Sequence, residues 1–216
     1  MIEIQIKINL QIFLFLVLFI LTHQIEIYTL IMLFAFIHEL GHMIAGIMLK
    51  LKPKSLSIMP FGISITFEAY GYKKLVELKK ILIFIAGPAT NVLIAIVVAF
   101  LNIDVNLKQT IIYSNMLIAI FNLIPLYPLD GGRILKGFIR IKKSELQADK
   151  IINKISNCII IIFTAISSIA ILYFKNFAIL FILIYLWLII LRENKKYNIK
   201  EKVYKAVQKS DKCIDN

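Results

Sequence analysis

The sequence predicts an all-α polytopic membrane protein with about six transmembrane helices and a small membrane-dipping β-hairpin. The composition is the first reason: 60% of the 216 residues are hydrophobic, and the mean hydropathy is +0.83. Soluble globular domains carry fewer apolar residues than this. The second reason is a series of apolar runs of bilayer-spanning character, at about 8–22, 27–49, 81–101, 110–129, 155–174 and 176–191.

The first and last runs need separate justification. The run at 8–22 has no basic region before it beyond Lys7 and no small-residue cleavage site after it. We therefore expect a retained span and not a secretory signal. The last two runs are separated by only two residues, 175–176, so a very tight turn must join them. We expect residues 1–192 to form one membrane domain and residues 193–216 to form a short basic cytoplasmic tail.

The basic residues predict the orientation of the chain. If the N-terminus is cytoplasmic, all of the 25 lysines and arginines except Lys108 and Lys175 fall on the cytoplasmic side. This distribution satisfies the positive-inside rule and places both termini in the cytoplasm. The net charge of +12 is then explained by topology and by anionic lipid headgroups, without nucleic acid as a partner.

A β-hairpin is predicted between the second and third runs. Residues 55–58 and 63–68 alternate apolar and polar side chains, and Met-Pro-Phe-Gly lies between them. This is strand periodicity around a turn. Such a hairpin, dipping into the membrane interface, could offer an edge to an extended substrate. The alternative is an amphipathic cover over the mouth of a cavity.

The second run contains the sequence His-Glu-Leu-Gly-His, in which His38 and His42 stand about one helical turn apart. On one face of a helix both imidazoles can bind a single Zn²⁺, and Glu39 is placed to take a proton from a metal-bound water. Ionisable residues are costly within a membrane span and are usually functional. The alternative is a pair of buried histidines that neighbouring groups satisfy.

A catalytic zinc site needs a third protein ligand. His23 lies in an outside loop far from the pair, whereas Asp130 ends the fourth apolar run. Pro125 and Pro128 interrupt the helix before Asp130, and the Gly-Gly sequence after it permits a sharp turn toward the metal. Asp130 could instead cap the following helix. Beside an intramembrane His-Glu-x-x-His, we favour the ligand.

Three segments in this order resemble the site-2 protease family of intramembrane zinc metalloproteases. They are His-Glu-Leu-Gly-His at 38–42, Gly-Pro-Ala-Thr-Asn at 87–91, and Asn-Leu-Ile-Pro-Leu-Tyr-Pro-Leu-Asp-Gly-Gly-Arg at 122–133. The layout without an inserted PDZ domain is most similar to the sporulation branch, which processes a membrane-tethered pro-sigma factor. A C-terminal CBS domain, frequent in that branch, is not expected because residues 193–216 are too short for one.

The resemblance implies that His38, His42 and Asp130 are zinc ligands and that Glu39 is the general base. It also implies that the asparagines of the motifs contact the substrate backbone or the oxyanion. For Asn91 and Asn122 the alternative is an interhelical hydrogen bond that packs two spans together. We favour function more strongly for Asn122, which precedes the Tyr-Pro-Leu-Asp segment.

The expected activity is therefore that of an intramembrane zinc metalloendopeptidase in regulated intramembrane proteolysis. Its substrate would be a membrane-tethered pro-sigma factor or another transcription regulator, and its further partners would be lipid and regulatory or inhibitory membrane proteins. The expected location is the bacterial cytoplasmic membrane, or in the sporulation branch the outer forespore membrane. The alternatives are an intramembrane metal transporter and a non-cleaving pseudoprotease. Transporters usually show repeat symmetry, whereas here the polar residues gather in one constellation.

Overall fold

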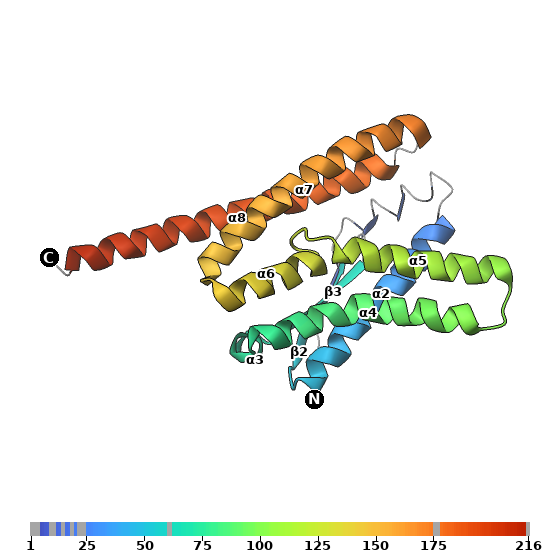
Figure 1. Cartoon of the computed structure of the whole chain (residues 1–216), viewed down its shortest axis with the longest axis horizontal. Coiled ribbons are helices and arrows are strands. Elements are labelled where there is room, and N and C mark those ends of the chain that lie inside the picture. The colour runs from blue at the N-terminus through green and yellow to red at the C-terminus, as the bar shows by residue number, and fades with distance from the viewer. Residues whose placement is uncertain are drawn as a thin grey trace. The chain divides into compact units, whose positions relative to one another are not determined.

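The structure is a computed structural model that describes residues 5–8, 12–13, 16–17, 20, 25–59, 62–174 and 178–214. The chain divides into two compact units, Met1–Ile124 and Pro125–Asn216. Among the described residues, the first unit contains a small sheet and three long helices, and the second contains three helices (Figure 1). Each unit is described by itself.

In the first unit, α4 (Glu77–Phe100) packs against both α2 (Ile25–Met48) and α5 (Val105–Leu123) (Figure 1). Small residues let α2 and α4 approach closely, as is usual between helices in a membrane. A Cβ atom at Gly41 would collide with the Thr90 hydroxyl and would lie 2.9 Å from the carbonyl oxygen of Ala86. The sequence of α2 therefore dictates a close crossing at the level of His38 and His42.

Helix α5 begins and ends for identifiable reasons. The Asp104 side chain accepts a hydrogen bond from the backbone N–H of Leu107 at 3.0 Å and so caps the N-terminus of α5. The helix ends at Leu123 because Ile124 precedes a proline and is extended, with φ −59° and ψ 131°. The apolar run expected to span residues 110–129 is thus helical only as far as Leu123, and the segment after it is not part of α5.

The sheet of the first unit has the strand order β1-β2-β3. Strands β2 (Pro53–Met59) and β3 (Gly62–Phe67) pair antiparallel, which confirms the predicted hairpin. Strand β1 (Gln5–Ile8) pairs parallel with β2 and was not predicted. Most of the expected first span, 8–22, lies outside the described residues. A short helix, α3 (Ala69–Lys74), follows the hairpin, whose position in the membrane interface stays a prediction.

In the second unit, α7 (Glu145–Phe174) packs against α6 (Asp130–Lys142) and against α8 (Ala178–Ile214) (Figure 1). The expected turn at 175–176 lies outside the described residues. The Trp187 indole N–H on α8 donates to the Thr164 hydroxyl of α7 at 3.0 Å. Helix α8 continues without interruption through the expected domain boundary at 192–193.

Charged residues join the helices of the second unit at one end. Lys200 on α8 lies 2.5 Å from Glu145 and 2.6 Å from Asp149, both on α7, and Lys136 on α6 lies 2.5 Å from Asp149. Burial disfavours the charged form of Lys200, but its hydrogen bonds to the two carboxylates outweigh this and raise its pKa. These ion pairs connect α6, α7 and α8 into one body.

Three described helices are long and apolar enough to cross a membrane: Tyr28–Met48, Glu77–Phe100 and Glu145–Tyr173. They coincide with three of the expected runs, 27–49, 81–101 and 155–174. The mostly helical fold with several candidate spans is therefore confirmed, whereas the count of six spans is not. Within the described part of the chain, α5 and α8 do not satisfy the same criterion of length and hydropathy.

Candidate metal centre

His38 and His42 lie on one face of α2 and are both buried, with 3% and 6% of their surface exposed. The spacing of four residues in a helix brings the two rings together. Their Nε2 atoms are 3.1 Å apart, and the ring planes are nearly perpendicular at 84°. The expectation that both imidazoles share one helix face is thus borne out by the geometry of α2.

Helix α4 anchors the other nitrogen of each ring. His42 Nδ1 lies 2.7 Å from the carbonyl oxygen of Ile83, and His38 Nδ1 lies 2.6 Å from the side-chain oxygen Oδ1 of Asn91. An oxygen of this kind only accepts hydrogen bonds, so Nδ1 must be the donor in both rings. Both Nε2 atoms are then left with a lone pair, and the two lone pairs share the space between the rings.

This arrangement fits a zinc ion. A tetrahedral ion with Zn–N bonds of about 2.0–2.1 Å holds two ligand nitrogens about 3.3–3.4 Å apart, close to the 3.1 Å between the two Nε2 atoms. Metal-binding histidines also usually donate their second N–H to a carbonyl or carboxylate, which fixes the tautomer and the ring orientation. His38 and His42 satisfy this requirement through Asn91 and Ile83.

Gly87 on α4 provides room beside the two rings. A Cβ atom at this position would lie 2.6 Å from Nε2 of His38 and would collide with Nε2 of His42. Ile83, Gly87 and Asn91 recur at intervals of four residues and so share one face of α4. This face of α4 therefore carries the Ile83 carbonyl that accepts from His42, then the space at Gly87, and then the Asn91 oxygen that accepts from His38.

Glu39 follows His38 on α2 and is half-buried. Successive residues of an α-helix are rotated by about 100°, so Glu39 flanks the face that carries the two imidazoles. The Glu39 carboxylate therefore begins next to His38 but does not lie on the helix face that carries the two imidazoles. This placement suits a group that handles protons beside a metal.

Asp130 belongs to the second unit, where it is the first residue of α6 and is buried, with 6% of its surface exposed. The capping position before α6 is held by Leu129, which makes no side-chain capping bond. Asp130 lies one residue inside the helix, in its first turn. A carboxylate in the first turn is still favoured by the helix dipole.

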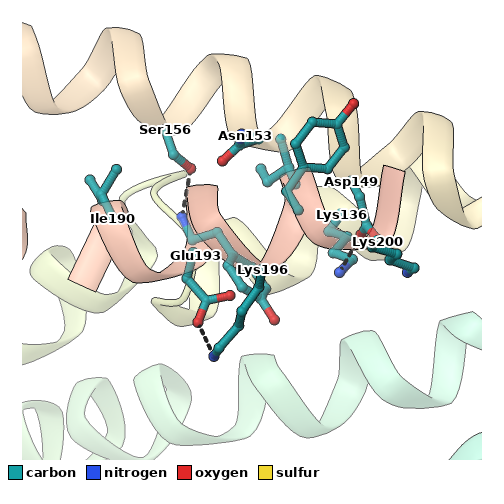
Figure 2. A pocket seen from close by; sticks show the side chains of 11 residues that line it. Lys136, Asp149, Asn153, Ser156, Ile190, Glu193, Lys196 and Lys200 are labelled. Carbon is teal, nitrogen blue, oxygen red and sulfur yellow. Dashed lines mark hydrogen bonds and ion pairs between the residues drawn. The ribbon is translucent and has the colours of Figure 1, made fainter. Parts of the chain in front are cut away.

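The segment before Asp130 is tied to α7. The backbone N–H of Tyr127 donates to the Ser156 hydroxyl at 2.9 Å, and Ser156 is 2% exposed (Figure 2). The ammonium group of Lys136 lies 4.9 Å from the centre of the Tyr127 ring. These residues line a cavity of about 100 Å³ in the second unit, together with charged residues of α7 and α8 (Figure 2).

The two asparagines singled out from the sequence differ in their surroundings. Asn91 is 0% exposed and bonds to His38, whereas Asn122 is half-buried and donates to the carbonyl of Ile118 on its own helix. A contact of either with substrate stays a prediction. Sequence reasoning did not single out Asn115, which is 0% exposed and bonds to Asn91.

Comparison with known families identifies this arrangement. The model of peptidase family M50 matches residues 26–106 and 104–163, which include the helices that carry both histidines, their anchors and Asp130. The chain belongs to peptidase family M50. The resemblance to the site-2 protease family is thereby confirmed. At the level of the family, the expected enzyme class, a zinc metalloprotease, and the expected cofactor, Zn²⁺, are confirmed as well.

Individual relatives agree with the M50 assignment. A zinc metalloprotease of Methanocaldococcus jannaschii is 31% identical over 133 residues, which are 58% of this chain and 38% of that protein. Stage IV sporulation protein FB of Bacillus subtilis is 29% identical over 119 residues, 53% of this chain and 41% of that protein. The M50 chain therefore spans about four-tenths of the length of these curated relatives.

A solved structure supports the fold over a greater part of the chain. The site-2 protease from Methanocaldococcus jannaschii matches with a TM-score of 0.69 and 25% sequence identity. The match covers 89% of this chain and 92% of that one. The M50 family consists of integral membrane proteins, in agreement with the apolar helices α2, α4 and α7.

Proposed function

We propose that this chain carries the catalytic centre of an intramembrane zinc metalloendopeptidase that cleaves a membrane-tethered protein. The observation that carries the proposal is the buried pair of His38 and His42, whose Nδ1 atoms are both held by acceptors of α4. A histidine pair with a purely structural role does not need an acceptor at the Nδ1 atom of both rings. A metal site needs it, because only an unprotonated Nε2 can bind zinc.

Asp130 is proposed as the third ligand. Two neutral imidazoles leave the double positive charge of zinc uncompensated, and an ion in an apolar setting needs a nearby counter-charge. Asp130 is a buried carboxylate at the start of α6, and its approach segment is held by Ser156. A ligand set of two histidines and one carboxylate leaves one coordination position open for chemistry.

Glu39 is proposed as the general base and acid. When bound, zinc lowers the pKa of water at the open position and polarises the carbonyl of the scissile peptide. The Glu39 carboxylate accepts the proton of the attacking water and then gives that proton to the amine nitrogen that leaves. Its position beside His38, half-buried and off the ligand face, is consistent with both transfers.

The substrate must be presented with its backbone accessible, because a helix engages its own carbonyls in hydrogen bonds. We infer that an unwound segment is held as an additional strand on β3, which lies at the edge of the sheet order β1-β2-β3. The Asn122 side chain is proposed to contact the substrate backbone. For Asn91, whose oxygen faces His38, we infer an orienting role.

The finer identity of the substrate follows from the sporulation resemblance. We propose a membrane-tethered pro-sigma factor or a related transcription regulator, supported by similarity to Stage IV sporulation protein FB. The orientation with both termini in the cytoplasm, in the bacterial cytoplasmic or outer forespore membrane, rests on the distribution of basic residues. Regulatory or inhibitory membrane proteins are proposed as partners because uncontrolled cleavage would release the regulator at all times.

Replacement of the base tests the mechanism. Glu39→Gln removes the proton acceptor but leaves all three proposed ligands, so zinc should remain bound while cleavage falls by at least about 100-fold. The variant and the wild type are each co-expressed with a membrane-tethered pro-sigma factor, cleavage is followed by immunoblot, and zinc in the purified proteins is measured by mass spectrometry. Undiminished cleavage by the variant would contradict the mechanism.

A further inference from the structure

We propose that Asn115, on α5, is a positioning residue that sets the tautomer of His38 through Asn91. The consequence for zinc rests on the function proposed above, whereas the tautomer itself is a property of the metal-free chain. Asn115 belongs to none of the motifs recognised in the sequence. Its role follows from the direction in which hydrogen bonds run through the interior of the first unit.

Three helices contribute to one chain of polar groups. The Asn115 amide nitrogen donates to the carbonyl oxygen of Ile111 at 2.9 Å. The Asn91 amide nitrogen donates to the side-chain oxygen of Asn115 at 2.9 Å, and the Asn91 oxygen lies 2.6 Å from Nδ1 of His38. Both asparagines are 0% exposed.

The direction of this chain is set at its far end. A backbone carbonyl only accepts, so Asn115 must turn its NH₂ group to Ile111 and its oxygen to Asn91. Asn91 must then donate to Asn115, which directs its own oxygen to His38. The carbonyl of Phe34 lies 3.5 Å from the Asn91 nitrogen, beyond the usual length of a hydrogen bond, and so favours the same orientation only weakly.

The result at His38 is a defined tautomer. Because it faces an acceptor, Nδ1 carries the proton, and Nε2 is left with a lone pair directed toward His42. If Asn91 were inverted, its NH₂ group would face Nδ1. The proton of a neutral His38 would then move to Nε2, which could not bind a metal. Asn115 excludes this inversion by offering Asn91 only an acceptor.

An ordinary role as interhelical glue is the competing explanation, since buried amides often link membrane helices. The second unit offers such a link for comparison. Asn194 on α8 donates to the oxygen of Asn157 on α7 at 3.0 Å. This amide pair has nearly the same length as the pair of Asn91 and Asn115. Asn157→Leu is therefore a matched control for the loss of one interhelical amide bond.

The test is the tautomer of His38 in metal-free protein. The chain has three histidines, so ¹⁵N-histidine labelling in a His23→Gln background leaves only the signals of His38 and His42. We expect both rings in wild-type protein to carry the proton on Nδ1. In Asn115→Leu, the His38 signals should shift toward the Nε2-protonated form. The His42 signals should not, because the Ile83 carbonyl still accepts from that ring.

Two further variants complete the experiment. Asn115→Asp keeps an oxygen that accepts from Asn91, whether the carboxyl is neutral or charged, and should restore the wild-type tautomer. Asn157→Leu should leave it unchanged. Zinc affinity, measured by competition with a chelator, should fall by about tenfold in Asn115→Leu and should recover in Asn115→Asp, as expected for a residue behind a ligand.

The inference is overturned if wild-type His38 carries its proton on Nε2, a result that needs no variant and so is independent of any folding defect. It is also overturned if folded Asn115→Leu keeps the wild-type tautomer. Failure of the proposed function gives a different result. The tautomers would follow the expectation, but neither zinc binding nor cleavage would be found in the wild type.

Discussion

A methyl group at Gly87 should remove zinc binding while leaving the fold in place. The Cβ of Gly87→Ala would lie 2.6 Å from Nε2 of His38 and closer still to Nε2 of His42, although real Cβ atoms essentially never approach another heavy atom within 3.0 Å. Zinc needs nearly the same proximity to these nitrogens, about 2.0–2.1 Å. The added methyl carbon would therefore take up space beside the two Nε2 atoms that a zinc ion bound to both of them needs.

The magnitude follows from how tightly the rings are held. Relief of the contact requires the His38 Nε2 atom to move by about 0.4 Å, the difference between 2.6 Å and 3.0 Å. Zinc–ligand distances tolerate only about 0.2 Å. The Nδ1 bonds of 2.6 Å and 2.7 Å also oppose rotation of either ring. We expect zinc affinity to fall by at least about 100-fold, the upper range for changes behind a ligand, and stability to fall by about 1–3 kcal/mol.

The assay compares Gly87→Ala with a glycine that has room. At Gly71 on α3, a Cβ would meet only the Leu51 side chain, at an ordinary 3.4 Å, so Gly71→Ala should bind zinc as the wild type does. Metal-free proteins are titrated with zinc against a chelator, and size-exclusion chromatography and circular dichroism verify that each is folded. If folded Gly87→Ala bound zinc with wild-type affinity, the steric reasoning would be refuted.

Two further predictions concern the third ligand and the topology. Asp130→Asn keeps the shape of the side chain but removes its charge, so the variant should insert into the membrane normally yet be inactive and poor in zinc by metal analysis. Full zinc occupancy there would exclude Asp130 from the site. In a cysteine-free background, cysteines replacing Lys73 and Lys143 should be shielded from an impermeant thiol reagent in intact cells, and one replacing Asn106 should be labelled. Labelling of position 143 from outside would contradict the proposed orientation.

Local patterns predicted much of the first unit. The alternation at 55–58 and 63–68 gave the hairpin because strand periodicity is visible within a few residues. The pair at His38 and His42 was predictable because helical spacing alone places the two rings together. Strand β1 could not be inferred in this way. Its pairing with β2 joins residues about fifty positions apart, and four residues carry too little pattern to specify a partner.

The extent of the fourth apolar run shows where hydropathy misleads. Hydrophobic residues continue to Leu129, but the backbone leaves the helix at Ile124, because the residue before a proline is driven out of the helical region. The interruption before Asp130 was predicted from Pro125 and Pro128, but the run at 110–129 extended past it because a hydropathy average gives a proline little more weight than any other residue. The non-helical segment after Ile124 leads to Asp130, the proposed third ligand.

Asn115 illustrates a kind of residue that a single sequence does not reveal. An asparagine in an apolar helix is as consistent with helix packing as with a site, and neither spacing nor composition connects it with a histidine 77 positions earlier. Only the arrangement of α2, α4 and α5 shows that Asn91 lies between them and bonds to both. The direction of those bonds is not visible in any sequence pattern, because it follows from a carbonyl that only accepts. That direction determines which nitrogen of His38 is the one proposed to bind zinc. The proposed ligand His38 can therefore be identified from five consecutive residues, whereas its orientation depends on the packing of three helices.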